Sequence, residues 1–252
     1  MTTIRNWACA LQCVLLVVSA TAAHAVQTLN GFKWRMNGPV LDINYKSAAS
    51  ADWLPFIERA AVQWSADGNI TGTVSPDTGS SACDPVWATV QLCSGNYGAT
   101  GWLGYTLVSS GGGYTSYATI RFNSYYFSQA KYNSSAWRTL VACHEIGHAL
   151  GLNHADNSAT NKNIGSCLDV TRDPSGSGTQ GPLADLQPGP NDFALLRTIY
   201  SNPFAVPARR YSATSHDYFP AVLDITEPAS AVASLGGLGM LLGSRKHRRA
   251  RR

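Results

Sequence analysis

The chain has 252 residues, of which 44% are hydrophobic and 13% are charged, a composition that predicts one domain with a sizeable core. Its formal charge of +4 is uneven, because six of the nineteen Lys and Arg residues lie between positions 245 and 252 and one more is Arg5. Residues 26–228 therefore carry 12 basic and 15 acidic side chains, which argues against a nucleic-acid partner.

The first 25 residues have the layout of a secretory signal peptide. Arg5 precedes an apolar run at residues 8–18, and an A-x-A cleavage sequence ends at Ala25. An N-terminal membrane anchor is the alternative, but such an anchor needs roughly 20 apolar residues and this run is shorter. We therefore expect residues 1–25 to be removed on export.

Between the two terminal segments, the sequence predicts short strands and loops with three helical segments among them. Apolar side chains at steps of three and four over residues 53–64 predict a helix, which Gly68 ends. Runs of β-prone residues between turn signals predict further short strands. These runs lie at residues 32–35, 41–45, 88–92, 102–108 and 117–122.

The stretch VACHEIGHALGLNHAD contains three of the six histidines of the chain. We expect a helix over residues 136–151, on which His144 and His148 are four positions apart and project from the same face. Two imidazoles held in this way can bind one metal ion. Gly151 can adopt the left-handed conformation that ends a helix, so the chain can turn back and bring His154 to the same metal.

The complete pattern is H-E-x-x-H-x-x-G-x-x-H. Glu145 lies about 100° around the helix from His144, from where it can reach a water at the metal without being a ligand. Five fixed positions arise by chance in about one chain of this length in ten thousand. We therefore predict a zinc site formed by His144, His148 and His154, and the alternative is histidines of the surface or core without a metal.

The motif and its surroundings resemble the metzincin clan of zinc peptidases and, within it, the matrixins. The resemblance covers approximately residues 31–201, including YATIRFN as an edge strand and PNDFALLRTIYS as the last helix. It implies an α+β fold, in which a twisted mixed sheet and two long helices surround a zinc cleft and a C-terminal helix follows. It also implies that an extended substrate binds antiparallel to the strand at residues 117–122.

Metzincins follow the third histidine with a tight turn whose methionine packs beneath the zinc ligands. Here methionine occurs only at positions 1, 36 and 240, and the best match is GSCLDV, which places Leu168 at the methionine position. Leu and Met have similar volumes, so the turn can survive. Cys167 would lie beside it, where a disulfide to Cys143 would tie the zinc helix to the turn.

Export makes a second disulfide possible between Cys83 and Cys93, which are close in sequence across a turn-rich segment. Buried thiols are the alternative for either pair. Matrixins also suggest structural calcium ions. The candidate calcium ligands are Asp42, Asp77, Asp84 and Asp156, although their spacing is not that of a calcium-binding loop. The alternative is that these aspartates are solvated loop residues without a metal.

The resemblance implies a zinc-dependent metalloendopeptidase that is secreted or anchored at the surface. Three neutral imidazoles leave an open zinc position for water and substrate, and Glu145 would be the general base that takes the water proton. The expected partner is a protein or peptide substrate, and the chain is expected to be monomeric. The alternatives are a catalytically inactive, zinc-binding surface or matrix protein and an enzyme acting on a non-protein amide.

The C-terminal part reads as a linker, residues 202–226, between a catalytic domain, residues 26–201, and a membrane or sorting segment, residues 227–252. Glu-Pro, a short apolar stretch and a basic tail resemble the PEP-CTERM sorting signals of Gram-negative bacteria, although Thr226 replaces the first proline. This layout implies a sorting transpeptidase as partner and a location in the periplasm, at the cell surface or in the extracellular matrix. An uncleaved tail anchor is the alternative.

Overall fold

The computed structural model describes residues 33–77, 83–201 and 217–224. The expected signal peptide, the sorting segment at residues 227–252 and part of the expected linker lie outside these ranges. Within the described ranges, every helix is too short or too polar to cross a membrane.

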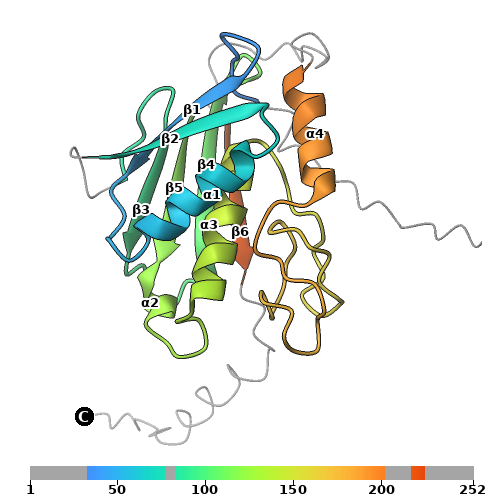
Figure 1. Ribbon diagram of the computed structural model, residues 1–252. Coiled ribbons are helices and arrows are strands. Elements are labelled where there is room, and N and C mark those ends of the chain that lie inside the picture. The colour runs from blue at the N-terminus through green and yellow to red at the C-terminus, as the bar shows by residue number, and fades with distance from the viewer. Residues whose placement is uncertain (1–32, 78–82, 202–216, 225–252) are drawn as a thin grey trace, which may run out of the picture.

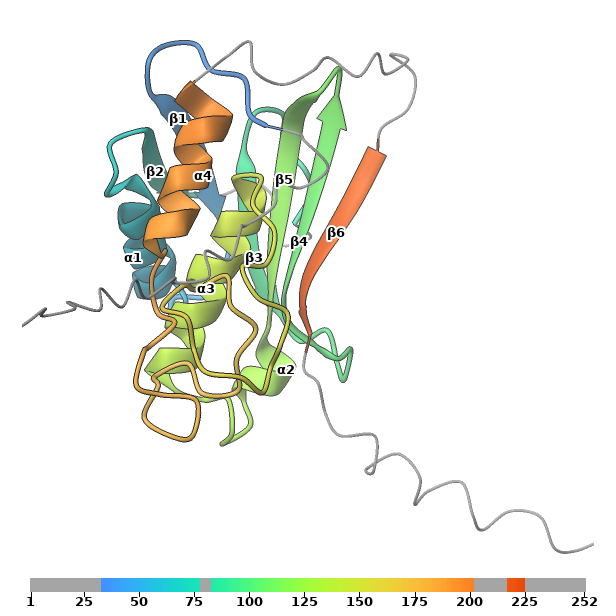
Figure 2. The same ribbon diagram turned by 90° about the vertical axis from the view of Figure 1, so that its right-hand side faces the viewer.

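A six-stranded mixed sheet forms one layer, and the helices lie on one side of it (Figures 1 and 2). The strand order is β2-β1-β3-β5-β4-β6, in which the first four are parallel and each of the last two is antiparallel to its preceding neighbour. This arrangement confirms the predicted α+β class. The strands are β1 (Leu41–Ser47), β2 (Ile70–Pro76), β3 (Val90–Gly95), β4 (Trp102–Gly111), β5 (Tyr114–Asn123) and β6 (Asp217–Asp224); the helices are α1 (Leu54–Ser65), α2 (Ser124–Phe127), α3 (Ser135–Ala149) and α4 (Pro190–Ser201).

The strand that was expected at the sheet edge lies inside the sheet. Residues 117–122 belong to β5, which pairs with β3 on one side and with β4 on the other, so the prediction of an edge strand there is wrong. It fails because β4 and β5 form one hairpin and both are largely buried, so their residue pattern does not indicate which strand is the outer one.

Strands β2 and β6 were not predicted from the sequence, and both lie at edges of the sheet. β2 contains Gly72, and β6 contains Pro220; both residue types weaken a strand pattern, and proline is tolerated at an edge. β6 occupies part of the segment that reads as a linker. In contrast, the piece expected at residues 32–35 forms only an isolated bridge between Lys33 and Tyr114.

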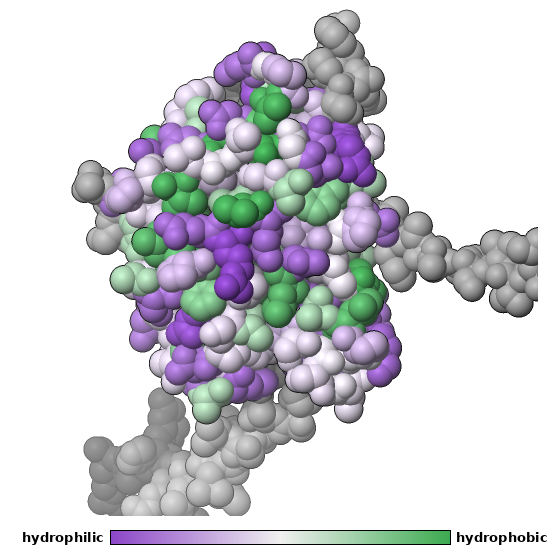
Figure 3. Space-filling model, in the orientation of Figure 1, coloured by the Kyte–Doolittle hydropathy of each residue, from purple (hydrophilic) through white to green (hydrophobic). Residues whose placement is uncertain are grey.

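Helix α1 lies beside α3 and packs against α3 and β2 through its predicted apolar face. Ile57 and Trp64 are almost completely buried on it, and just before the helix Trp53 stacks on Phe122 of β5 with ring centroids 4.1 Å apart. The outer surface is mixed, with hydrophilic residues across the middle of the face in Figure 3 and small apolar patches between them. Val62 of α1, which is 71% exposed, belongs to this outer side.

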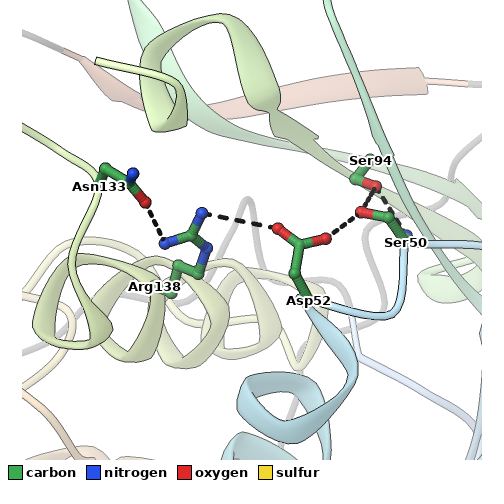
Figure 4. Close-up of polar contacts among 5 residues, drawn as sticks. All are labelled: Ser50, Asp52, Ser94, Asn133 and Arg138. Atoms are coloured by element: carbon green, nitrogen blue, oxygen red, sulfur yellow. Dashed lines mark hydrogen bonds and ion pairs between the residues drawn. The ribbon is translucent and has the colours of Figure 1, made fainter. Parts of the chain in front are cut away.

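A polar cluster joins the starts of α1 and α3 to β3 (Figure 4). Arg138 donates a hydrogen bond to Asn133 (3.0 Å) and forms an ion pair with Asp52 (3.5 Å). The Ser50 hydroxyl contacts both Asp52 and the hydroxyl of Ser94. Because exposed ion pairs contribute only about 0–1 kcal/mol, this cluster sets the orientation of the helices more than their stability.

The C-terminal end of α3 is fixed by two buried aromatic side chains. The indole of Trp34 donates to the carbonyl oxygen of Ala149 (2.7 Å), and the hydroxyl of Tyr200 in α4 donates to that of Leu150 (2.6 Å). The last carbonyls of a helix have no partner within the helix, so these bonds satisfy groups that would otherwise be buried without one. These bonds attach the segment around Trp34 and helix α4 to the end of α3.

The segment between α3 and α4 contains no long helix or strand, and buried carboxylates hold its turn at residues 164–169. Asp185 accepts hydrogen bonds from the amides of Gly165 (2.8 Å) and Ser166 (3.2 Å). Asp192, in the first turn of α4, accepts one from the Ser166 hydroxyl (2.6 Å). Asp169 accepts one from a further amide of the same turn (3.3 Å). The turn is therefore built by side chains from three separate parts of the chain.

Burial raises the pKa of both Asp169 and Asp185 above the usual aspartate value of 3.8, and the nearby Asp185 charge raises that of Asp169 further. A folded protein with raised carboxyl pKa values keeps a proton that the unfolded chain has already lost. The stability that this proton contributes is present at acid pH and is lost as pH rises from the unfolded pKa through the folded one.

In the wild type, the free energy of unfolding should fall between about pH 5 and pH 8, by about 1.4 kcal/mol for each unit by which folding raises the pKa of Asp169. We predict that Asp169→Asn makes this fall shallower, because the amide cannot ionise. The asparagine can still accept from the amide and donate to Asp185. Urea unfolding across this pH range measures the slope. An unchanged slope in Asp169→Asn would contradict the prediction.

Candidate metal centre

Helix α3 carries two of the three predicted ligands in its last two turns. It begins after Ser134, whose hydroxyl accepts a hydrogen bond from the amide of Trp137 (3.3 Å). His144 and His148 are fully buried on it. Gly151 follows with a φ of 101°, the left-handed conformation that was expected to turn the chain back.

This turn brings His154 beside the other two histidines. The ring centroid of His144 lies 4.5 Å from that of His148 and 4.9 Å from that of His154, and the distance between the His148 and His154 centroids is also 4.9 Å. One ring nitrogen of each lies within 4.8 Å of the others. The structure thus brings together the three histidines that the motif singled out.

Each imidazole is oriented by a hydrogen bond at Nδ1. That of His144 lies 2.7 Å from the carbonyl oxygen of Cys167, and that of His148 lies 2.8 Å from the carbonyl oxygen of Leu152. His154 Nδ1 lies 2.7 Å from the side-chain oxygen of Asn157. An oxygen acceptor fixes the proton on Nδ1 and directs the lone pair of Nε2 into the space between the rings, as in metal-binding histidines.

Burial also keeps the imidazoles of His144 and His148 neutral. It is the largest cause that lowers the pKa of His144 well below its usual value, and the neighbouring His148 and His154 lower it further. Burial and His154 together lower the pKa of His148 to about 3. A metal ion needs the unprotonated nitrogen, so this pocket holds its histidines in the form that binds one.

The donor set fits zinc. In the described part of the chain, the three histidines are the only group of three or more His, Cys, Asp or Glu residues that could hold a metal ion. The Nε2 atoms of His144 and His148 are buried and make no hydrogen bond to any described residue, which is costly without a ligand. Three imidazoles with one position left open is the ligand set of a catalytic zinc site.

A turn beneath the histidines is joined to α3 in three ways. The disulfide Cys143–Cys167 confirms the predicted pair, as Cys83–Cys93 does for the other. Cys167 also accepts the hydrogen bond from His144. Leu168 is fully buried, and its side chain lies so close to Gly147 that a Cβ there would be 2.8 Å from it. Leu168 thus packs against α3 at Gly147, between His144 and His148 in the sequence, and its role as the substitute for the methionine stays a prediction.

Glu145 is fully buried between α3 and β4, and two β4 residues that sequence reasoning missed lie against it. The Thr106 hydroxyl is 2.5 Å from Oε2 of Glu145. A Cβ at Gly104 would lie 2.3 Å from Oε1 of the same carboxylate, so only glycine leaves room for it. A glycine inside a strand often marks such a close approach, which is the one sequence signal that pointed to this contact.

The aspartates considered for calcium lie apart and have partners of other kinds. Asp42 accepts from the Thr71 hydroxyl (3.1 Å), and Asp156 accepts from the amide of Ser158 (2.7 Å). Asp77 contacts Gln91, and Asp84 is exposed. Calcium binding at these four positions stays a prediction.

No protein-family model matches the chain, and no curated protein does. Among solved structures, it is similar to high choriolytic enzyme 1, a hatching enzyme zinc-protease from the medaka fish Oryzias latipes, with 13% identity and a TM-score of 0.40 over 68% of this chain and 94% of that one. It is also similar to myroilysin, with 14% identity and a TM-score of 0.39 over 70% of this chain and 99% of the other.

We predict that the purified protein binds one zinc ion per chain and that His148→Ala does not retain it. The matched control is His216→Ala, a histidine outside the motif, which should retain zinc. Chelation should lower the wild-type free energy of unfolding by roughly 3–4 kcal/mol, the amount expected at free zinc 100 to 1,000 times Kd. Atomic emission and urea unfolding measure both effects; equal zinc in wild type and His148→Ala would contradict the assignment.

Proposed function

We propose that the protein is an exported, zinc-dependent metalloendopeptidase of the metzincin type. His144, His148 and His154 hold the zinc ion, and Glu145 is the general base. The observation that best supports this proposal is the convergence of three imidazoles, each with Nδ1 tied to an oxygen acceptor, beside the buried carboxylate of Glu145, which follows His144 on the helix.

A zinc ion on these three imidazoles supplies Lewis acidity, which polarises a carbonyl group and lowers the pKa of a water molecule. Burial keeps His144 and His148 neutral, and the Nδ1 hydrogen bonds orient their rings. Glu145 takes a proton from the attacking water and returns it to the leaving amine. The Thr106 hydroxyl holds one oxygen of that carboxylate in place and, by donating a hydrogen bond, stabilises its charged form.

The substrate is an extended segment of protein or peptide that pairs with β4 rather than with β5. β4 is the strand that lies against Glu145, through Gly104 and Thr106, whereas β5 lies between β3 and β4 inside the sheet. The other edge of β4 is paired with the last strand, β6, whose place the substrate would take. Strand pairing uses backbone groups that every residue has, so binding along β4 gives little sequence preference. The bond that is cut is an internal peptide bond.

We further propose that the chain works outside the cytoplasm as a monomer without a nucleic-acid partner. Two disulfides support an oxidising location. The N-terminal signal sequence and the C-terminal sorting sequence support export to the Gram-negative periplasm, surface or matrix, with a membrane and a sorting transpeptidase as partners.

Cleavage of unfolded casein by the wild type and by Glu145→Gln tests the peptidase. The glutamine keeps the size of the side chain but cannot accept the proton, so we expect the rate to fall by about 10²- to 10⁴-fold while one zinc ion stays bound. Chelation should abolish wild-type cleavage, and added zinc should restore it. One bound zinc without cleavage by either protein would favour the inactive zinc-binding surface protein or an enzyme for non-protein amides instead.

Thr106→Val should lower kcat by about 10- to 100-fold with little change in KM, because it keeps the shape of Thr106 but removes the hydroxyl that holds Glu145. Thr106→Ser restores a hydroxyl at the same position and is the matched control. Steady-state kinetics on one peptide substrate, with thermal unfolding to verify folding, measures the difference. Equal kcat values for the valine and serine variants would exclude a positioning role.

A further inference from the structure

β6 covers the outer edge of β4, the edge along which the proposed substrate would pair. It runs antiparallel to β4, with Ala221 opposite Thr106, Val222 opposite Tyr105 and Pro220 opposite Leu107. Thr106 is the residue whose hydroxyl contacts Glu145. The C-terminal segment is therefore paired at the point of β4 that is closest to the general base.

The same strand also lies close to α3, the helix that carries His144, Glu145 and His148. Figure 2 shows β6 as the last strand of the sheet, beyond β4. An extended peptide cannot pair with β4 while β6 does, because both need the same backbone N–H and C=O groups of one strand edge.

We infer that Asp217–Asp224 is an intramolecular competitor for extended peptides at the edge of β4 and holds the enzyme in a closed state. This inference rests on the proposed function, because it regulates the same site. A tethered segment competes at an effective concentration in the millimolar range, well above that of most free substrates. A peptide can therefore pair with β4 only in the fraction of molecules in which β6 has left the edge of β4.

Several features of β6 allow it to leave. Among residues 33–77, 83–201 and 217–224, β6 pairs with β4 alone, so its departure breaks one ladder there. Pro220 has no N–H and donates no hydrogen bond, and the pairing with β4 is irregular between Trp102 and Tyr105. An edge strand of this kind is held more weakly than the inner strands. This weaker pairing lets β6 leave the edge of β4 and return to it.

The test compares two full-length variants, both carrying Glu145→Gln so that no peptide is consumed. Ala221→Pro/Val222→Pro removes two successive backbone donors, one of which faces β4 in either register of an antiparallel pair. Ala221→Ser/Val222→Thr changes the same two side chains and keeps both donors. The probe is a fluorescein-labelled peptide of residues 217–224, DYFPAVLD, which is the known occupant of this edge.

We expect the proline variant to lose hydrogen-exchange protection along Trp102–Gly111 and to keep it in α3, whereas the control keeps both. The labelled peptide should bind the proline variant at least about tenfold more tightly, since apparent affinity scales with the open fraction. With Glu145 restored, the proline substitutions should lower the KM for casein by a similar factor and leave kcat unchanged.

Equal β4 protection in the two variants, or equal peptide affinity after protection is lost, would overturn the inference. Neither readout needs catalysis. If the proteins with Glu145 restored cleave nothing but the exchange and binding differences appear, the competition at β4 is supported and the proposed peptidase function fails.

Discussion

The hydrogen bond between His144 Nδ1 and the carbonyl oxygen of Cys167 is the constraint on which the rest of the site depends. It orients the first ligand, and it ties the motif helix to the turn beneath it. The disulfide from Cys143 to the same Cys167 closes this connection covalently, one residue before the ligand. Leu168 then packs under Gly147, in the turn of the helix between the two ligands. One short contact region therefore fixes ligand orientation, helix position and the floor of the pocket together.

Other parts of the fold limit the remaining freedom of that helix. The Arg138 cluster holds its start, and Trp34 and Tyr200 satisfy carbonyls at its end. From the other side β4 closes over Glu145 through Gly104 and Thr106, which leaves the carboxylate little room to move. A catalytic constellation needs such support, because a site that is loose by about 1 Å loses most of its activity. The aspartates that hold the turn with Leu168, Asp169 and Asp185, have pKa values raised by burial. Their ionisation at neutral pH therefore lowers the stability of the folded protein, although their hydrogen bonds shape this turn.

The cluster of three histidines was predictable because it is local. Three histidines and Gly151 lie within eleven residues, where helix periodicity and one left-handed turn determine their positions. The pair Cys83–Cys93 followed from closeness in sequence, whereas the pair Cys143–Cys167 and the place of Leu168 were expected from the resemblance to metzincins. The edge strand, Gly104 and Thr106 were not predictable, since they depend on which hairpin strand lies outside and on what it faces across the sheet. β6 was missed because Pro220 interrupts its apolar run, and proline weakens a strand pattern.

X-ray absorption at the zinc edge tests the central claim most directly, because it counts the ligands of the metal without requiring turnover. The account predicts three imidazole nitrogens at about 2.0–2.1 Å, with an oxygen ligand completing the shell and no sulfur at about 2.3 Å. Substitution of His154 should remove one imidazole from this shell. A shell that contains sulfur, or one in which fewer than three imidazoles contribute, would contradict the assignment of His144, His148 and His154 as the zinc ligands.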